Sequence, residues 1–190
     1  MSTTEQQFDH IIDICRNLFA QKLKDYGTSW RILRQTSVTD QIFIKANRIR
    51  SIETKKVNMV GDDIRDELIG IINYSIIGLI QMELGDSIND DLTNEKALEL
   101  YEKYINKAKN LMLSKNHDYD EAWRLMRTES YTDLILMKIN RIKKIEDNQG
   151  KTLVSEGIDA NYLDMINYAI FGLIKIEFGD EFNFQQKLPE

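Results

Sequence analysis

Apolar residues recur at helical spacing along most of the chain, in three blocks that appear twice in the same order. In the first block they fall three or four positions apart with polar residues between them, which is typical of an amphipathic helix that starts near Thr4. These positions are Phe8, Ile11, Ile12, Cys15, Leu18 and Phe19, and their counterparts in the second half are Leu98, Tyr101, Ile105, Ala108, Leu111 and Met112. The pattern predicts an all-α fold.

The second block gives the clearest sign of a duplication. Residues 39–53 read TDQIFIKANRIRSIE, and residues 132–146, which lie 93 positions later, read TDLILMKINRIKKIE, with nine of fifteen positions identical. Polar residues are kept as well as apolar ones, which a shared amphipathic pattern alone does not require. The chain is therefore predicted to be a tandem duplication of a three-helix unit.

The ends of these second helices can also be placed from the sequence. We expect the first copy to begin after Ser37, with Asp40 three residues on, and the second copy after the equivalent Ser130, because this spacing is typical of a helix start. Glu53 and Glu146, near the helix ends, are interpreted as surface charges.

The third block is apolar on nearly every side from Leu68 onward, which indicates a helix buried all round. It is interpreted as too short and too interrupted to span a bilayer, so no membrane partner is expected. Two helices of one repeat cannot cover such a surface, so the third helices are expected to pack together in one pseudo-two-fold helical bundle. The boundaries follow as a first repeat over 1–86, a polar linker over 87–94, and a second repeat with a C-terminal tail over 95–190.

Composition excludes several classes of protein. The net charge is −6, and no run of Lys and Arg stands out, so polymeric nucleic acid is not an expected partner. The lone Cys15 on an apolar helix face is interpreted as a small core residue in a reducing compartment. The first residues lack a secretion signal, so we expect a cytoplasmic protein. An internal duplication favours a monomer or a simple homodimer.

Each second helix carries a basic pair at the same place. Lys45 falls within the apolar face of its helix and Arg48 at the edge of that face, and Lys138 and Arg141 repeat both positions. A lysine there either extends its charged end past the core or points into a polar pocket. Because both copies keep the pair, phosphate binding by these four side chains is weighed against that structural reading.

Each first helix runs into a shared ending that contains a tryptophan. Trp30 and Trp123 either fill the corner between helices or provide a surface on which a base stacks. Lys22 lies three residues before Asp25, as do their counterparts in the second repeat, and such pairs can simply meet on an exposed helix face.

The third helices carry polar side chains on an otherwise apolar surface, where an unpartnered polar group costs roughly 1–3 kcal/mol. Asp164 lies well inside its helix and therefore needs a cation, a metal or hydrogen-bond donors. Asp63 and Asp159, near the helix starts, either complement the helix dipole or bind a metal. Asn73 and Asn167 either lock helices together or orient the carboxylates.

These features together resemble the nucleotide modification associated domain family. The resemblance rests on Lys-x-x-Asp-Tyr-Gly followed by Trp30, on Lys45-x-x-Arg48, and on Asp164-x-x-Asn167-Tyr168 in a buried third helix. It covers most of the chain, twice. The helical order is in turn similar to the all-α NTP pyrophosphatases of the MazG and dimeric dUTPase type. That superfamily implies Mg²⁺-dependent cleavage of a nucleoside triphosphate to the monophosphate and pyrophosphate, with the second repeat in place of a partner subunit.

The chain departs from that superfamily in its acidic residues. The pyrophosphatases carry two carboxylate pairs that converge on Mg²⁺, an ion that prefers octahedral oxygen ligation. Here the third helices read Glu67-x-x-Gly70 and Asn161-x-x-Asp164, so each copy retains half of one pair, and Lys-x-x-Arg stands on the second helices. Either a composite site is assembled from both repeats, or the metal is lost and a phosphate pocket is left.

Two functional hypotheses follow. In the first, the chain binds a nucleotide or another phosphorylated small molecule and cleaves it with Mg²⁺. Asp63, Glu67, Asp159 and Asp164 would then hold the metal, with Glu67 and Asp164 as the catalytic carboxylates. In the second, it is a catalytically silent nucleotide-binding or protein-interaction scaffold. The sequence contains neither a nucleophilic Ser or Cys arrangement nor a glycine-rich phosphate loop, so it suggests no third hypothesis.

Overall fold

The computed structural model of the chain describes residues 3–56 and 63–179. The first half contains α1 (Thr4–Tyr26), the 3-10 helix η1 (Ser29–Ile32), α2 (Gln35–Lys55) and α3 (Ile64–Leu84), and the second half contains α4 (Asn94–Tyr119), η2 (Ala122–Leu125), α5 (Thr128–Asp147) and α6 (Ile158–Phe178). No strand occurs in these residues, which confirms the predicted all-α fold. The C-terminal tail expected after α6 lies outside the described residues.

The two repeats form one bundle in which equivalent helices run antiparallel. At its centre, α3 packs against α6, with Tyr162 near the start of α6 beside Gly78 of α3 and Leu68 near the start of α3 beside Gly172 of α6. Leu68 and Tyr162 are equivalent positions, as are the two glycines. Buried apolar residues of all six α-helices belong to one core cluster. The predicted pseudo-two-fold bundle is confirmed.

The helices α2 and α5 meet through polar contacts that obey the same symmetry. The Thr39 hydroxyl donates to Glu146 Oε1 at 2.7 Å, and the Thr132 hydroxyl donates to Glu53 Oε1 at 2.8 Å. Two ion pairs flank them, Lys143–Asp40 at 2.6 Å and Arg50–Asp133 at 3.5 Å. Much of the polar identity between the repeats therefore serves the contact between them.

Two expectations about these helices are wrong. Glu53 and Glu146 are half-buried between the repeats and are not simple surface charges. The helices also start earlier than expected, at Gln35 and Thr128, without a side-chain cap. Asp40 and its counterpart Asp133 face the other repeat, where they pair with a cation and do not cap the first turn.

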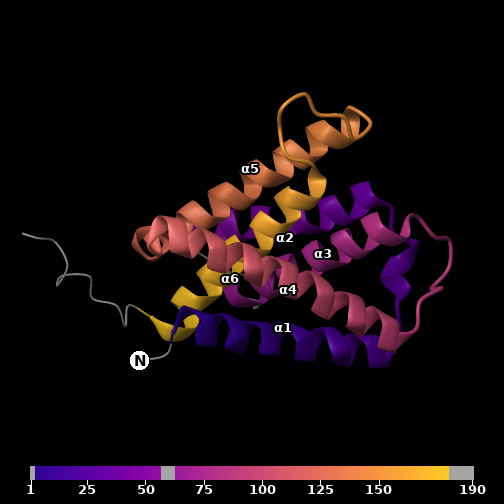
Figure 1. Cartoon of the computed structure of the whole chain (residues 1–190), viewed down its shortest axis with the longest axis horizontal. Helices are drawn as coiled ribbons and strands as arrows, with labels where there is room; N and C mark the ends of the chain where they lie inside the picture. The colour runs from indigo at the N-terminus through magenta and orange to yellow at the C-terminus, as the bar shows by residue number, and fades with distance from the viewer. Residues whose placement is uncertain (1–2, 57–62, 180–190) are drawn as a thin grey trace, which may run out of the picture.

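The helices α1 and α4 lie side by side along one face of the bundle (Figure 1). They are also antiparallel, since Lys109 of α4 pairs with Asp9 near the start of α1 at 2.8 Å and Asn94 Nδ2 donates to Leu23 O near its end at 3.0 Å. Cys15 of α1 is fully buried, and burial raises the pKa of its thiol to about 12. This agrees with its interpretation as a core residue.

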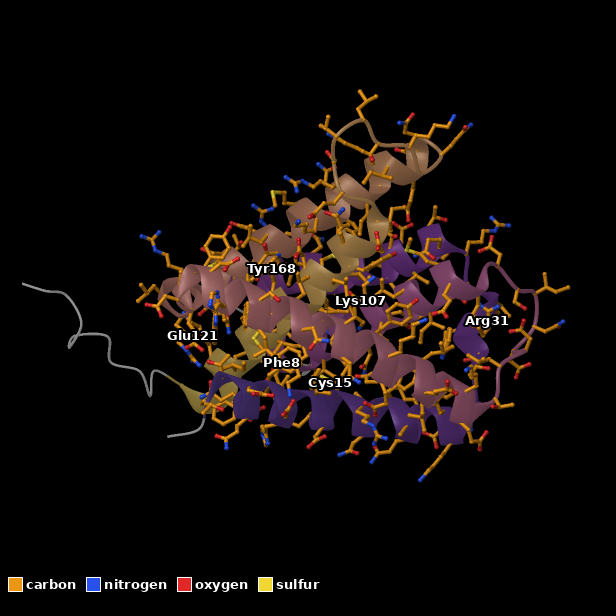
Figure 2. The ribbon with its side chains drawn as sticks, viewed as in Figure 1. Phe8, Cys15, Arg31, Lys107, Glu121 and Tyr168 are labelled. Atoms are coloured by element: carbon orange, nitrogen blue, oxygen red, sulfur yellow. The ribbon has the colours of Figure 1, made fainter. Side chains whose placement is uncertain are left out.

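Arg31 of η1 and Glu121, which directly precedes η2, lie at opposite ends of the molecule (Figure 2), and an arginine in each 3-10 helix holds a neighbouring segment. Arg31 of η1 donates to Asp91 Oδ1 at 2.8 Å and to Gly85 O at 3.0 Å, which holds the linker. The equivalent Arg124 of η2 donates to Glu121 at 2.6 Å and to Gln7 Oε1 at 2.9 Å, which holds the start of α1. These contacts fix the position of the tryptophans, which precede the arginines directly.

The third helix of the first repeat is long and apolar enough to cross a membrane, so the expectation based on its length is wrong. Its surface is instead mostly buried, because α1, α2, α4 and α6 all pack against it. The apolar run is explained by contacts with the other helices of the chain.

Replacing both Glu53 and Glu146 with glutamine should flatten the pH dependence of stability. Burial, with neighbouring carboxylates, raises the pKa of each above its ordinary value, so the folded state binds protons more tightly than the unfolded chain. The contribution of these two groups to stability therefore falls as pH rises from the ordinary value of 4.5 toward neutral pH. Glutamine keeps the acceptor for each threonine but removes the charge. We expect the double variant to gain no more than about 1 kcal/mol per site at neutral pH, since both side chains are partly exposed.

Thermal unfolding followed by circular dichroism across this pH range measures the effect. The matched variant is Asp13→Asn, because Asp13 is exposed on α1 and is not among the carboxylates that raise the pKa of Glu53 or Glu146. Parallel profiles of Tm against pH for the parent and the double variant would contradict the assignment of this pH dependence to Glu53 and Glu146.

Candidate functional site

A cavity of about 610 Å³ opens between α1, η1, α2 and α3 of the first repeat. Its lining combines cations, carboxylates and aromatic rings, contributed by Phe19, Lys22, Tyr26, Trp30, Lys45, Asp66, Glu67 and Tyr74 among others. Small-molecule sites in proteins typically have volumes of about 300–1,000 Å³ and mix apolar walls with a few polar groups. The cavity is therefore suited to a small charged molecule that contains a ring.

The buried carboxylate of the cavity is shared by two cations of α2. Glu67 has 7% of its side chain exposed and accepts from Arg48 Nη1 at 2.5 Å and from Lys45 Nζ at 3.3 Å. Arg48 is the closer partner, so Glu67 keeps a counter-charge when Lys45 turns elsewhere. The predicted basic pair thus meets the predicted carboxylate directly, at one wall of the cavity.

Gly70 provides the space in which the Lys45 side chain lies. A Cβ atom placed on Gly70 would stand 2.6 Å from Lys45 Cε and 2.7 Å from Lys45 Cδ. The ammonium group lies 6.0 Å from the centre of the Tyr74 ring, which is also part of the lining. A glycine at this position therefore keeps a lysine inside the cavity.

A second cation reaches the cavity from α1. Lys22 is exposed, lines the cavity and forms no ion pair within residues 3–56 and 63–179. The surface pair with Asp25 suggested by their spacing is not formed. Lys22 is therefore available to a ligand, and sequence reasoning missed it because helical spacing alone placed it on the surface.

Trp30 forms the aromatic wall. It is 8% exposed, with the Phe19 ring centre 6.5 Å from its own. Its indole N–H is buried and donates to no atom of the described residues, a feature that Trp123 shares. The ring fills the corner between helices, as the first reading from the sequence expected, and it also lines the cavity. Base stacking on it stays a prediction.

In the second repeat, a carboxylate of α6 stands at the position that corresponds to Gly70. Asp164 stands where the first repeat has Gly70, as the alignment of Asn167 with Asn73 shows. Its carboxylate accepts from Lys138 Nζ and from Lys115 Nζ, each at 2.6 Å, with 7% of the Asp164 and Lys138 side chains exposed. Burial alone would lower the pKa of Lys115, but the hydrogen bond and charge of Asp164 raise it.

In the second repeat, an aromatic side chain of α6 also packs on the tryptophan. Trp123 stacks on Phe171 with ring centres 4.2 Å apart and an angle of 6° between the planes. The residue equivalent to Phe171 in the first repeat is Ile77, which lines the cavity. The opposite face of Trp123 carries the Arg124 guanidinium at 4.3 Å.

The two asparagines act as locks between helices. Asn73 Nδ2 donates to Cys15 O at 3.2 Å, and Asn167 Nδ2 donates to the equivalent Ala108 O at 3.1 Å. The Tyr101 hydroxyl also donates to Asn73 Oδ1 at 2.9 Å. Their hydrogen bonds therefore go to the first helices of the repeats and not to the carboxylates that they were predicted to orient.

The residues predicted to hold Mg²⁺ do not come together. Glu67 and Asp164 each face two cations, Asp159 lies 3.7 Å from Lys107 Nζ, and Asp63 caps α3 by accepting from Arg65 N. Within the part of the chain that the structure describes, no three His, Cys, Asp or Glu side chains gather as a metal site would need. This donor set does not fit Mg²⁺, and no chemical step is assigned to it.

Arg141, the last of the predicted phosphate-binding residues, is not one of the two cations paired with Asp164. It lines a separate hollow of about 660 Å³, together with Lys144, Lys151 and residues of the loop between α5 and α6. The basic pairs of the two repeats are thus used differently, since Arg48 binds a buried glutamate and Arg141 is exposed.

Comparison with known protein families agrees with the duplication. The model of the family described as Nucleotide modification associated domain 1 matches residues 22–82 and again residues 115–176. The chain belongs to this family. Each matched segment starts at the cavity lysine or its counterpart, Lys22 or Lys115, and ends within the third helix of its repeat, so the family's unit omits most of α1 and α4. Neither the curated proteins nor the solved structures gave a match.

Proposed function

We propose that the first repeat binds a nucleotide in its cavity, while the second repeat completes the bundle that holds the cavity in shape. The observation that carries this proposal is Lys45, which lines the same cavity as Trp30, shares Glu67 with Arg48 and has no carboxylate of its own at position 70. The family's description, which associates the domain with nucleotide modification, supports the same class of ligand.

The cavity offers a partner to each part of a nucleotide. Lys45 and Lys22 are flexible cations that bind phosphate oxygens through charge-assisted hydrogen bonds. Trp30 and Tyr74 offer ring faces and edges to a base, and stacking on such rings contributes about 1–3 kcal/mol per base. Glu67 remains paired with Arg48 throughout, so phosphate entry leaves no buried carboxylate without a counter-charge.

The hydrolytic hypothesis requires carboxylates that converge on a metal. Glu67 and Asp164 are each neutralised by two cations, so we propose binding without cleavage in this chain. Appearance of products in the experiment below would make that choice wrong.

Thermal unfolding in the presence of the common ribo- and deoxyribonucleoside triphosphates, with and without Mg²⁺, tests the proposal. A nucleotide that binds only the folded chain should stabilise it by about 2.7 kcal/mol at a concentration of about 100 times its Kd. The stabilisation should be lost in Lys45→Met, which keeps the aliphatic stem across Gly70, and kept in Lys107→Met, whose lysine is exposed on α4 and does not line the cavity.

The same mixtures are analysed by chromatography for products. We expect the triphosphate to be recovered intact. A monophosphate with pyrophosphate would support the hydrolytic hypothesis, and the absence of stabilisation by every nucleotide would overturn nucleotide binding itself.

A further inference from the structure

In the second repeat, two side chains of α6 stand at positions that correspond to cavity-lining residues of the first repeat. Asp164 and Phe171 of α6 occupy the places of Gly70 and Ile77 of α3. The carboxylate of Asp164 is held by Lys115 and Lys138, which are the equivalents of Lys22 and Lys45. The ring of Phe171 is stacked on Trp123, the equivalent of Trp30.

We infer that Asp164 and Phe171 stand in for a ligand, so that they mark where the anionic group and the ring of a nucleotide bind in the first repeat. The inference rests on the proposed function and adds two statements to it. Lys22 is a phosphate-binding residue together with Lys45, and the phosphate lies over Gly70 between their ammonium groups. The base stacks on the face of Trp30 near Ile77.

The geometry of the second repeat shows that this arrangement satisfies its charges. Both ammonium groups donate to one carboxylate at 2.6 Å, the distance of a strong charge-assisted hydrogen bond. A phosphate presents oxygens of the same kind and at least the same charge. In the first repeat, α3 has neither an anion at 70 nor a ring at 77, and its Glu67 is shared between Lys45 and Arg48, so a ligand would supply the two missing groups.

The spacing of the two stand-in residues sets the size of the ligand. They are seven residues apart on α6, which at about 1.5 Å per residue places their Cα atoms about 10 Å apart. A mononucleotide, with one ring and a phosphate within that distance, matches this spacing. A dinucleotide has a second ring for which the second repeat shows no counterpart.

Substitutions at Gly70 test whether a carboxylate there replaces the ligand. Gly70→Asp recreates the second repeat's arrangement, and Gly70→Asn adds nearly the same volume without the charge. Each variant is titrated by calorimetry with ADP, GDP, CDP and UDP, beside the parent, Lys22→Met and the neighbouring Lys24→Met. Circular dichroism and thermal unfolding confirm that each variant is folded.

The expected result is a graded loss of affinity. Gly70→Asp and Lys22→Met should weaken binding at least about tenfold, since each removes a charge-assisted contact to the phosphate. Gly70→Asn should bind more tightly than Gly70→Asp, and Lys24→Met should match the parent, because Lys24 does not line the cavity.

Three outcomes would overturn the inference. Parent-like binding by both Gly70→Asp and Lys22→Met would refute it and leave the proposed function standing. Equal losses in Gly70→Asp and Gly70→Asn would also refute it, because filled volume would then explain the effect. A parent chain that binds none of these four nucleotides, and that no nucleoside triphosphate stabilises, would overturn the proposed function and this inference with it.

Discussion

Replacing Asp164 with alanine is expected to lower the free energy of unfolding by about 3–5 kcal/mol, the usual cost of removing one partner from a buried ion pair. Asp164 is the shared acceptor for Lys138 and Lys115, and only 7% of the Lys138 side chain is exposed. Without the carboxylate, the Lys138 ammonium is left buried beside apolar residues of α5 and α6. Its desolvation is then uncompensated.

A double variant distinguishes the effect of losing the Asp164 side chain from the effect of leaving the Lys138 ammonium group without a counter-charge. Asp164→Leu with Lys138→Met replaces the buried pair by apolar side chains of similar length, which is often neutral or stabilising. We expect it to recover most of the stability lost in Asp164→Ala. The measurement is urea unfolding of both variants and the parent. An Asp164→Ala chain as stable as the parent would contradict the structural role assigned to this residue.

This expectation changes how the Asp164→Ala variant has to be interpreted in an activity assay. From the sequence, loss of activity in this variant would have identified a catalytic carboxylate. In the structure, the same loss follows from unfolding of the second repeat. Activity data on this variant therefore carry information only beside its melting curve.

Replacing Gly78 with alanine is expected to destabilise the chain by about 2 kcal/mol, from overpacking and disturbed hydrogen bonds less the gain in helix propensity. The added methyl group would lie 2.7 Å from Tyr162 Cζ. Tyr162 cannot retreat easily, because its ring is fully buried and its hydroxyl is hydrogen-bonded to Gln35 and Thr39, each at 2.9 Å. The expected fall in Tm is about 4–8 °C for a chain of this size.

The pseudo-symmetry of the bundle provides the matched control. In Gly172→Ala, the added methyl group would lie 3.2 Å from Leu68 Cδ1, the end of a side chain that can adjust. We expect this variant to stay within about 1 kcal/mol of the parent. Combining Gly78→Ala with Tyr162→Leu gives the same pairing of alanine with leucine as Gly172→Ala and should recover part of the loss. Equal effects of the two alanines would contradict the described packing of α3 on α6.

The fold could be predicted from the sequence because its evidence is local and appears twice. The 3.6-residue periodicity placed each helix, and a third helix apolar on all sides required the repeats to share it. Asp120, at the end of α4, adopts the left-handed conformation that aspartate tolerates better than most residues. Periodicity gave the face of each helix but could not say which helix covers it. For that reason Glu53 was assigned to the surface, although it accepts a hydrogen bond from Thr132 of the other repeat.

The candidate site could be predicted only in part. The contact of Lys45 and Arg48 with Glu67 joins two residue sets that the sequence had selected separately, one for phosphate and one for metal. Polar identity between the repeats could not separate ligand binding from contacts between helices, because both keep charged residues. The position of Lys22 at the cavity depends on how α1 lies over α3, which no pattern within α1 reports. The closure of the second repeat by Asp164 and Phe171 likewise emerges only when α3 and α6 are placed in equivalent positions.

The stoichiometry of nucleotide binding tests the central claim of this account most directly. Titration calorimetry of the parent chain with the nucleotide that stabilises it most should give one site per chain, because the cavity of the first repeat has no carboxylate at position 70, whereas Asp164 fills the equivalent place in the second repeat. The site should be absent in Lys45→Met and present in the Asp164→Leu, Lys138→Met double variant. Two equal sites per chain, or a site that survives Lys45→Met and disappears in the double variant, would contradict it.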